Sequence, residues 1–446
     1  MPAARKRLDF RAQTAYIFSH FKTKLGETNM SFALRFKLSA MMFLQFMLVA
    51  VFFVPLAVYL KSIQAEGVMI ATIMATMAWG AILSPIVGML ADRLMNAEKV
   101  LFILNILVAT MLVVSATNQN HYVLFVCLLV AMCAYMPTWG LTSSIAITNS
   151  TPEAFPLIRV FGSIGWVCAA AFAIVAKWGF DTAIDGTAIP FYCGAGVAVI
   201  AAANALLLPK TAPAAKGQPM SIVDALGLKA FSMLKDKNTA VMMLCSCLWM
   251  VAFSIYWLFF SMYLDSALKV ENITATMNVG QISEMAFIAL LPVAIKLFGM
   301  KLTMALGIFA MVLRYAFCAY ALDVDGLYWG AIAVHGIIFG FFFVTAQMYM
   351  AKKAPKELQA RAQGLFFCLA FGVAQIVGAY FTNWLIDINT ATLTAESVKQ
   401  TANAVAEVVT QASVIDWKSV FLTETAISGV LLVVFLLFFK NDVKEG

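Results

Sequence analysis

The chain has 446 residues, of which 63% are hydrophobic and only 12% are charged, and its mean hydropathy is +0.89. Soluble domains hold about 45–50% apolar and about 25% charged residues, so this composition excludes a soluble globular protein and predicts an integral membrane protein with room for about a dozen spans. The formal net charge of +7 is expected from Lys and Arg in loops on one side of a membrane, and it predicts no nucleic-acid partner.

The cysteine and histidine pattern bears on disulfides, metals and cofactors. All eight cysteines lie in apolar segments, where they are typical packing residues rather than a disulfide framework. Cys245 and Cys247 lack companion His or Cys ligands, so no metal site is predicted. The sequence has no nucleophile–base spacing and no phosphate-binding loop, so we predict that the protein is not an enzyme and has no cofactor, with the proton as coupling ion.

The first 36 residues form a basic extension ahead of the first apolar segment. No continuous apolar core or small-residue cleavage site precedes that segment, which argues against a cleaved signal peptide. Met30 precedes a sequence typical of a membrane-protein start, so we hypothesise that residues 1–29 are dispensable or that translation starts at Met30.

Twelve apolar runs follow, each long enough to cross about 30 Å of hydrocarbon as a helix. Backbone groups in lipid must be satisfied internally, and the alternating polarity of a β-barrel is absent, so the fold class is all-α. The runs are 38–60, 67–91, 99–117, 122–147, 156–178, 188–209, 239–264, 274–298, 301–322, 327–351, 360–387 and 417–440.

A polar central loop at residues 210–238 divides the spans into six and six. This pattern predicts two six-helix bundles, at residues 37–209 and 239–446. With the N-terminus inside, the cytoplasmic segments hold 23 of the 30 Lys and Arg residues and the external segments hold 5, the other 2 lying within spans. This bias predicts that both termini are cytoplasmic.

The stretch from Asn278 to Glu284 places polar groups inside an apolar span. Gln281 and Glu284 are three residues apart, so a helix presents them on one face. A carboxylate at the bilayer centre costs about 2.5 kcal/mol or more, and such residues normally face a cavity or a partner. Glu284 is therefore interpreted as a substrate or proton group. The alternative is a structural pair with Arg314, which also lies mid-span and is itself interpreted as structural.

The loop after the second span reads Gly-Met-Leu-Ala-Asp-Arg at residues 88–93. Glycine permits close approach at a helix end, and Asp92 with Arg93 can lock neighbouring helices. The motif resembles a signature of the major facilitator superfamily, and an ordinary charged turn is the alternative. The resemblance implies two six-helix bundles that rock around a central cavity.

Further stretches resemble the nucleoside–proton symporter family within that superfamily, whose members are bacterial nucleoside permeases. They are collinear and extend over nearly the whole chain after about residue 35. The matching stretches are FLQF at 43–46, AYMPT at 134–138, FPLIRVFGSIGW at 155–166, ALGLKAF at 225–231, QISE at 281–284, LRYAFCAY at 313–320 and RAQG at 361–364.

The resemblance implies a substrate pocket built from both bundles. Arg159, Ser163 and Trp166 share one helix face by their spacing. Arginine offers a fork of hydrogen-bond donors to ribose or base oxygens, and the aromatic residue a face for base stacking. The alternative places Arg159 among lipid headgroups. The family pocket also implies Gln281, Glu284, His335 and Phe339, although a lone His in an apolar helix is often a packing residue.

The sequence departs from the family pattern at several pocket positions. Family members carry an acidic residue where this chain has Gly340, so proton coupling here is expected to rest on Glu284, with His335, or to be absent. Ser254 and Trp257 occupy positions of family Gln and Asn residues, and Phe371 replaces an Asn. The expected pocket is therefore more aromatic and has fewer hydrogen-bonding groups.

These observations predict a bacterial inner-membrane carrier, active as a monomer, that takes up nucleosides with protons by alternating access. Three alternatives stay open. The protein could be a carrier for another small polar solute, such as a sugar or a modified nucleoside. It could also be an uncoupled facilitator or a transporter-like sensor. The hydrogen-bonding groups of the expected pocket differ from those of the family, which favours a different solute, since buried polar groups discriminate strongly between ligands.

Overall fold

The structure is a computed structural model that describes residues 30–151, 154–213, 228–355, 359–393 and 412–443. The N-terminal segment 1–29 lies outside these residues. The Asp92 and Arg93 backbone continues a helix, whereas their side chains are outside the description, so their expected locking role stays a prediction.

The first bundle contains six spans, several of them formed by two consecutive helices. Pro55 separates the first two helices, as expected of a residue that has no backbone N–H and interrupts a helix. The helices are α2 (Phe32–Phe53), α3 (Leu56–Ser62), α4 (Gly67–Met74), α5 (Thr76–Leu94), α6 (Ala97–Ala116), α7 (His121–Thr148), α8 (Phe155–Cys168), α9 (Ala170–Phe180) and α10 (Ile189–Leu206).

The second bundle follows a short 3₁₀ segment, η1 (Leu228–Lys235). Three of its spans contain a π-helical stretch, a feature that widens the helix locally and is frequent at functional sites. The elements are α12 (Lys237–Ser254), η2 (Ile255–Phe259), α13 (Phe260–Ser266), α14 (Ile273–Tyr320), α15 (Leu327–Ala333), η3 (Ile337–Val344), α16 (Thr345–Lys353), α17 (Gln359–Phe366), η5 (Phe367–Val373), α18 (Ala374–Ile388) and α20 (Trp417–Phe438).

The long helix α14 contains two spans. It has 48 residues, about 72 Å at 1.5 Å per residue, which is more than twice the thickness of a bilayer core. Gly299 interrupts it with φ 73° and ψ 165°, a backbone conformation that is essentially restricted to glycine. Among the described residues, eleven apolar helical segments are long enough to span a membrane, and the division at Gly299 makes twelve spans. The prediction of twelve helices in two six-helix bundles is confirmed.

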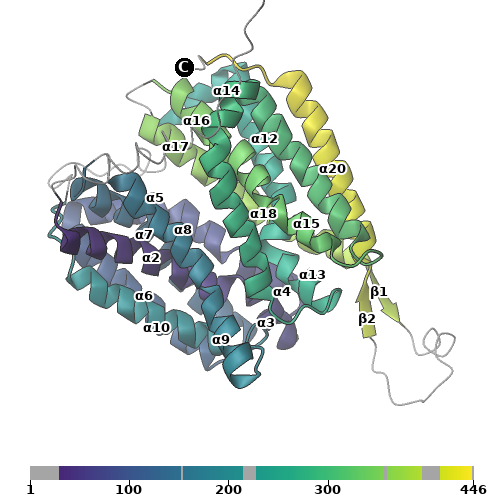
Figure 1. The fold of residues 1–446 in the computed structure, drawn as a ribbon, viewed down its shortest axis with the longest axis horizontal. Coiled ribbons are helices and arrows are strands. Elements are labelled where there is room, and N and C mark those ends of the chain that lie inside the picture. The colour runs from purple at the N-terminus through teal and green to yellow at the C-terminus, as the bar shows by residue number, and fades with distance from the viewer. Residues whose placement is uncertain (1–29, 152–153, 214–227, 356–358, 394–411, 444–446) are drawn as a thin grey trace, which may run out of the picture.

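One short antiparallel hairpin lies outside the helical spans (Figure 1). Its strands are β1 (Thr390–Leu393) and β2 (Ala412–Ile415), with Thr390 opposite Ile415. The hairpin joins α18 to α20, and it projects from the end of the molecule where the second bundle begins its last span.

The quoted FLQF and AYMPT stretches meet inside the first bundle. The Gln45 amide donates to Asn105 Oδ1 at 3.2 Å and to Thr138 Oγ1 at 2.8 Å, and all three residues are buried. The Tyr135 hydroxyl donates to the Gln45 carbonyl oxygen at 2.8 Å. This network fixes α2 against α6 and α7, and so supports the side chains that α2 presents to the second bundle.

The two bundles lean against each other at the end where α3, α4, α9 and α13 lie, and their opposite ends are further apart in the view of Figure 1. We call the first region the closed end. Three interactions join the bundles there. Asp185 accepts hydrogen bonds from the Thr274 amide at 3.1 Å and hydroxyl at 2.7 Å, Lys177 pairs with Glu271 at 3.1 Å, and the hydroxyls of Thr72 and Tyr380 lie 3.0 Å apart.

Candidate functional site

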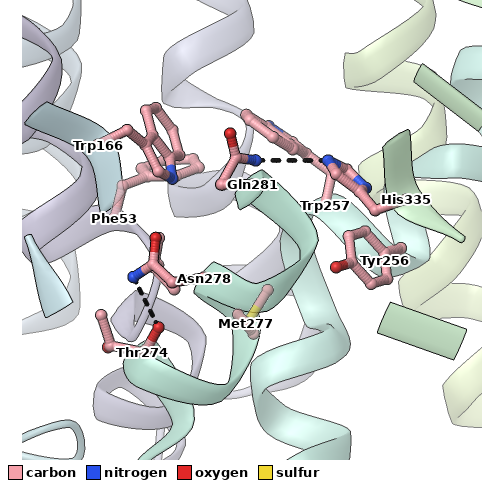
Figure 2. Close-up of a pocket in the computed structure, with 10 residues that line it drawn as sticks. Phe53, Trp166, Tyr256, Trp257, Thr274, Met277, Asn278, Gln281 and His335 are labelled. Carbon is pink, nitrogen blue, oxygen red and sulfur yellow. Dashed lines mark hydrogen bonds between the residues drawn. The ribbon is translucent and has the colours of Figure 1, made fainter. Parts of the chain in front are cut away.

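A pocket lies between the bundles, next to the closed end (Figure 2). The first bundle contributes the end of α2 and one side chain of α8, and the second contributes η2, the first turns of α14 and His335, the second residue after α15. The cavity volume is about 30 Å³, which is enough for water. The lining residues are Phe53, Val54, Trp166, Tyr256, Trp257, Thr274, Met277, Asn278, Gln281 and His335.

Glu284, His335 and Gln281 form a polar cluster at this pocket. His335 Nε2 lies 3.2 Å from Glu284 Oε2 and 3.4 Å from the Gln281 amide nitrogen. The His335 side chain is 1% exposed and that of Glu284 is 19% exposed, so the imidazole is dry while the carboxylate keeps access to the space between the bundles. The cluster thus joins a titratable pair to an amide that can bind a solute.

One atom of His335 serves both neighbours. With hydrogen on Nε2, the imidazole donates to the Glu284 carboxylate; without it, Nε2 accepts from the Gln281 amide. The other ring nitrogen, Nδ1, has no hydrogen-bond partner within the described part of the chain. The protonation of His335 therefore selects which of the two side chains it holds.

Close helix packing brings His335 to this position. A Cβ at Gly336 would lie 2.2 Å from the Ser283 carbonyl oxygen, so only glycine permits this approach of the two segments. The Ser283 hydroxyl donates to the Ala333 carbonyl and accepts from the Gly336 amide at 3.2 Å. These contacts align the Gln281–Glu284 face of α14 with the imidazole.

Arg314 does not pair with Glu284, contrary to the alternative interpretation of that carboxylate. Arg314 is fully buried, its Nε donates to the Ala331 carbonyl oxygen at 2.9 Å, and its Cζ lies 3.6 Å from the centroid of the Tyr256 ring. Tyr256 in turn stacks on His335 with ring centroids 5.1 Å apart. Arg314 thus supports the wall of the pocket through a cation–π contact.

Arg159 faces the pocket region from the first bundle. Its Cζ lies 4.3 Å from the centroid of the Phe46 ring, and a Cβ at Gly162 would lie 2.8 Å from its guanidinium. Its charge interacts across the interface with that of Glu284. The guanidinium thus lies between the bundles rather than among lipid headgroups, which favours the binding interpretation over the lipid-facing one.

Aromatic rings from the two bundles meet across the interface. The Trp166 and Trp257 ring centroids lie 5.9 Å apart at 31°, and Phe371 lies 6.3 Å from Trp257 and 6.5 Å from Trp139. Trp257 and Phe371 both belong to π-helical stretches, η2 and η5. Their local widening coincides with two of the positions where the sequence was expected to depart from the family pattern.

Five sequence-predicted residues do not line this pocket: Arg159 and Glu284, which lie near it as described above, and Ser254, Phe339 and Ser163. Ser254 is buried and its hydroxyl donates to the Met250 carbonyl oxygen at 2.8 Å; a Cβ at Gly378 would lie 2.1 Å from that hydroxyl oxygen. Phe339 stacks on the far side of His335, with ring centroids 6.2 Å apart. Ser163, on the same helix as Trp166, is half-buried. Their roles remain predictions.

Sequence reasoning missed several lining residues, above all Tyr256, which holds both Arg314 and His335. It also missed Asp185, whose carboxylate caps the start of α14 from the opposite bundle. Asn278 belonged to the polar stretch already singled out, and that signal could have identified it. Asp185 gave no signal, because its loop lies far from α14 in the sequence.

The profile of the family described as "Nucleoside H+ symporter" matches residues 30–444. The putative nucleoside transporter YegT of Escherichia coli (strain K12) is 35% identical over 350 residues, which are 77% of this chain and 82% of that protein. The xanthosine permease of the same strain is 27% identical over 437 residues, 93% of this chain and 97% of that protein. The crystal structure of the nucleoside transporter NupG superposes with a TM-score of 0.77 at 27% identity, covering 92% of this chain and 100% of that one.

Proposed function

Because the chain belongs to the nucleoside–proton symporter family, a family of multi-pass membrane transporters, we propose that it carries nucleosides inward together with protons. The observation that carries this proposal is the 3.2 Å contact between His335 and Glu284, one hydrogen bond away from Gln281. Because the proton site and the solute-binding amide share one imidazole nitrogen, proton binding and solute binding affect each other.

The coupling follows from the two partners of His335. A proton shared by Glu284 and His335 keeps the imidazole donating to the carboxylate and leaves the Gln281 amide free for the solute. Loss of that proton lets Nε2 accept from Gln281, which then competes with the solute. Proton and nucleoside therefore favour the same arrangement of the pocket, and by linkage each raises the affinity for the other.

Recognition of the nucleoside divides between rings and polar groups. Trp166 and Trp257, one from each bundle, offer faces to the base, and stacking of this kind contributes about 1–3 kcal/mol per base. Gln281, Asn278 and Arg159 offer donors and acceptors to base edges and ribose hydroxyls. Since these groups come from both bundles, binding draws the bundles together around the solute.

The charge distribution orients the carrier. With both termini in the cytoplasm, as the excess of Lys and Arg in the corresponding loops favours, the closed end faces outside. Asp185–Thr274 and Lys177–Glu271 then hold the external side shut. We propose a bacterial inner-membrane location, a monomeric carrier, and rocking of residues 37–209 against 239–446, joined by the cytoplasmic loop 210–238.

Uptake of labelled uridine and adenosine into proteoliposomes, with and without an inward proton gradient, tests the proposal. Saturable uptake that requires the gradient supports it. Absence of nucleoside uptake and of nucleoside counterflow, in protein shown to be folded, would reject the cargo.

One observation favours uncoupled transport as a second candidate. Gly340 lies against apolar groups of α14, and a Cβ there would meet Ile288 at 3.3 Å and backbone of Phe287 at 3.7 Å. Position 340 therefore has no proton-binding group, in contrast to family members. Saturable uptake of equal rate with and without the gradient would identify a facilitator.

A further inference from the structure

A second buried carboxylate lies away from the pocket, on the last span. Glu424 is on α20, seven residues after its start and thus about 10 Å along the helix. Glu424 is 0% exposed, and neither of its carboxylate oxygens has a hydrogen-bond partner among the described residues. The Ser428 hydroxyl, one turn further along the same face, is also buried without a partner there.

An ionised carboxylate in this position is strongly unfavourable, because it has left water without gaining a counter-charge or a donor. Protonation removes the charge and leaves only a neutral polar group to be buried. We propose that Glu424 is a second proton-binding site of the carrier, distinct from Glu284, and that it gains and loses its proton during the transport cycle.

The surroundings of Glu424 link it to the pocket. α20 packs mainly against α14 and also against α12 and α18. From α14 the Tyr315 phenol interacts electrostatically with the carboxyl group. None of the described side chains of α12 or α18 forms a hydrogen bond or ion pair with it. The Tyr315 hydroxyl donates a hydrogen bond to the Ala252 carbonyl oxygen of α12.

A row of buried groups continues from Tyr315 to the pocket. Arg314 is its neighbour in sequence, the Arg314 guanidinium lies on Tyr256, and Tyr256 stacks on His335 beside Glu284. The two terminal nitrogens of Arg314 have no hydrogen-bond partner within the described chain. These buried groups form a continuous row from Glu424 to the wall of the substrate pocket.

This inference rests on the proposed symport, because a proton site matters to transport only if protons drive it. At zero membrane potential and a gradient of one pH unit, each coupled proton allows about tenfold accumulation of solute, since one unit of proton activity corresponds to a factor of ten. Two titrating carboxylates allow about a hundredfold, and one allows about tenfold.

The decisive experiment measures the limiting accumulation of uridine in proteoliposomes with the membrane potential clamped at zero. For Glu424→Gln we expect the limit at one pH unit to fall about tenfold, with nucleoside counterflow retained. Asp387→Asn, which neutralises an exposed carboxylate of the same bundle, is the matched control and should accumulate like the wild type. Accumulation by Glu424→Gln that equals the wild type at every gradient would overturn the proposal.

Infrared difference spectroscopy on the reconstituted carrier keeps the inference testable if Glu424→Gln does not fold. We expect a protonated carboxylic-acid band that persists in Glu284→Gln and changes with pH. A carboxylic-acid band that Glu284→Gln abolishes entirely would overturn the second site. This readout needs no transport, so absence of nucleoside counterflow in the wild type would reject the proposed cargo while leaving the result on Glu424 interpretable.

Discussion

Oε2 of Glu284 on α14 lies 3.2 Å from Nε2 of His335. Through this pair the second bundle presents its titratable groups to the pocket. The contact joins a helix that begins at the closed end with a segment broken between α15 and η3. A rearrangement at the closed end therefore moves one partner of the pair directly, and this gives the first prediction.

Glu284→Gln should lower gradient-driven uridine accumulation while retaining counterflow. Glutamine keeps the shape and a hydrogen-bond acceptor but cannot carry the exchangeable proton. Since hydrogen bonds to charged groups contribute about 1.5–3 kcal/mol, gradient-driven uptake should fall roughly 10- to 100-fold. Parallel counterflow and accumulation assays on the same proteoliposomes separate the two effects, and unchanged accumulation would place coupling elsewhere.

His335→Phe should separate the polar from the aromatic role of this side chain. Phenylalanine retains the stack on Tyr256, whose centroid is 5.1 Å away, but loses Nε2. Without Nε2, no imidazole competes with the nucleoside for the Gln281 amide. We therefore expect that nucleoside affinity no longer depends on pH. Isothermal titration of uridine binding over a pH series checks this, and a pH dependence equal to that of the wild type would contradict it.

Trp257→Ala should weaken nucleoside binding by removing one wall of the aromatic pair with Trp166. A lost stacking partner of about 1–3 kcal/mol corresponds to a rise in Kd of roughly 5- to 150-fold, and Trp257→Phe should recover part of it. Trp178→Ala is the control, because Trp178 is 84% exposed on the outer surface of its bundle. Equal Kd values for Trp257→Ala and Trp178→Ala would remove the indole pair from the binding site.

The fold was predictable because its signals are local and strong. Apolar runs of span length and the polar segment 210–238 specify twelve helices in two bundles without reference to tertiary contacts. The breaks within spans were not predictable, because no residue type in η2, η3 or η5 demands a π-helix.

The site was predictable as a set of residues but not as a set of partners. Gln281 and Glu284 stood out as polar groups in an apolar helix, whereas His335, Trp166 and Trp257 were implied by the family resemblance. Whether Glu284 pairs with Arg314 or His335 depends on helix rotation and on close approach at Gly336, which sequence separation does not encode. The roles proposed for Asp185 and Glu424 follow only from their tertiary surroundings, which the sequence alone does not give.

Gly299→Ala should destabilise the second bundle. At φ 73° and ψ 165° a Cβ is strained, at a cost of about 1–3 kcal/mol, and the break between the two spans of α14 depends on this residue. Gly429→Ala is the matched control, since a Cβ at this helical position of α20 meets no atom within 4 Å and should be neutral or slightly stabilising. Thermal unfolding in detergent distinguishes the two, and equal midpoints would contradict the prediction.

Asp185→Asn should remove a pH dependence from closure of the external side. Burial raises the pKa of the Asp185 carboxyl in this closed arrangement, although hydrogen bonds from Thr274 lower it in part. A raised pKa means that the closed arrangement binds the proton more tightly than one in which Asp185 is in water. The closed arrangement is therefore most favoured at low pH, and this preference declines as pH rises from about 3.9, the ordinary Asp value, through the raised pKa. Distances between spin labels at Thr182 and Asp325, measured over a pH series, follow the change.

The substitution Asp185→Asn preserves the geometry of the closed end while removing its titration. The asparagine oxygen can accept from the Thr274 amide while its NH₂ group donates to the Thr274 hydroxyl. The variant should therefore still close and still transport, but with label distances that no longer respond to pH in this range. Asp181→Asn is the matched control, because Asp181 lies in the same loop with its side chain 91% exposed and should leave the wild-type response intact. Since an external proton favours closure in this scheme, acidification outside promotes the step by which a loaded carrier turns inward. Label distances in the wild-type protein that do not change with pH would contradict this prediction, regardless of the distances measured in Asp185→Asn.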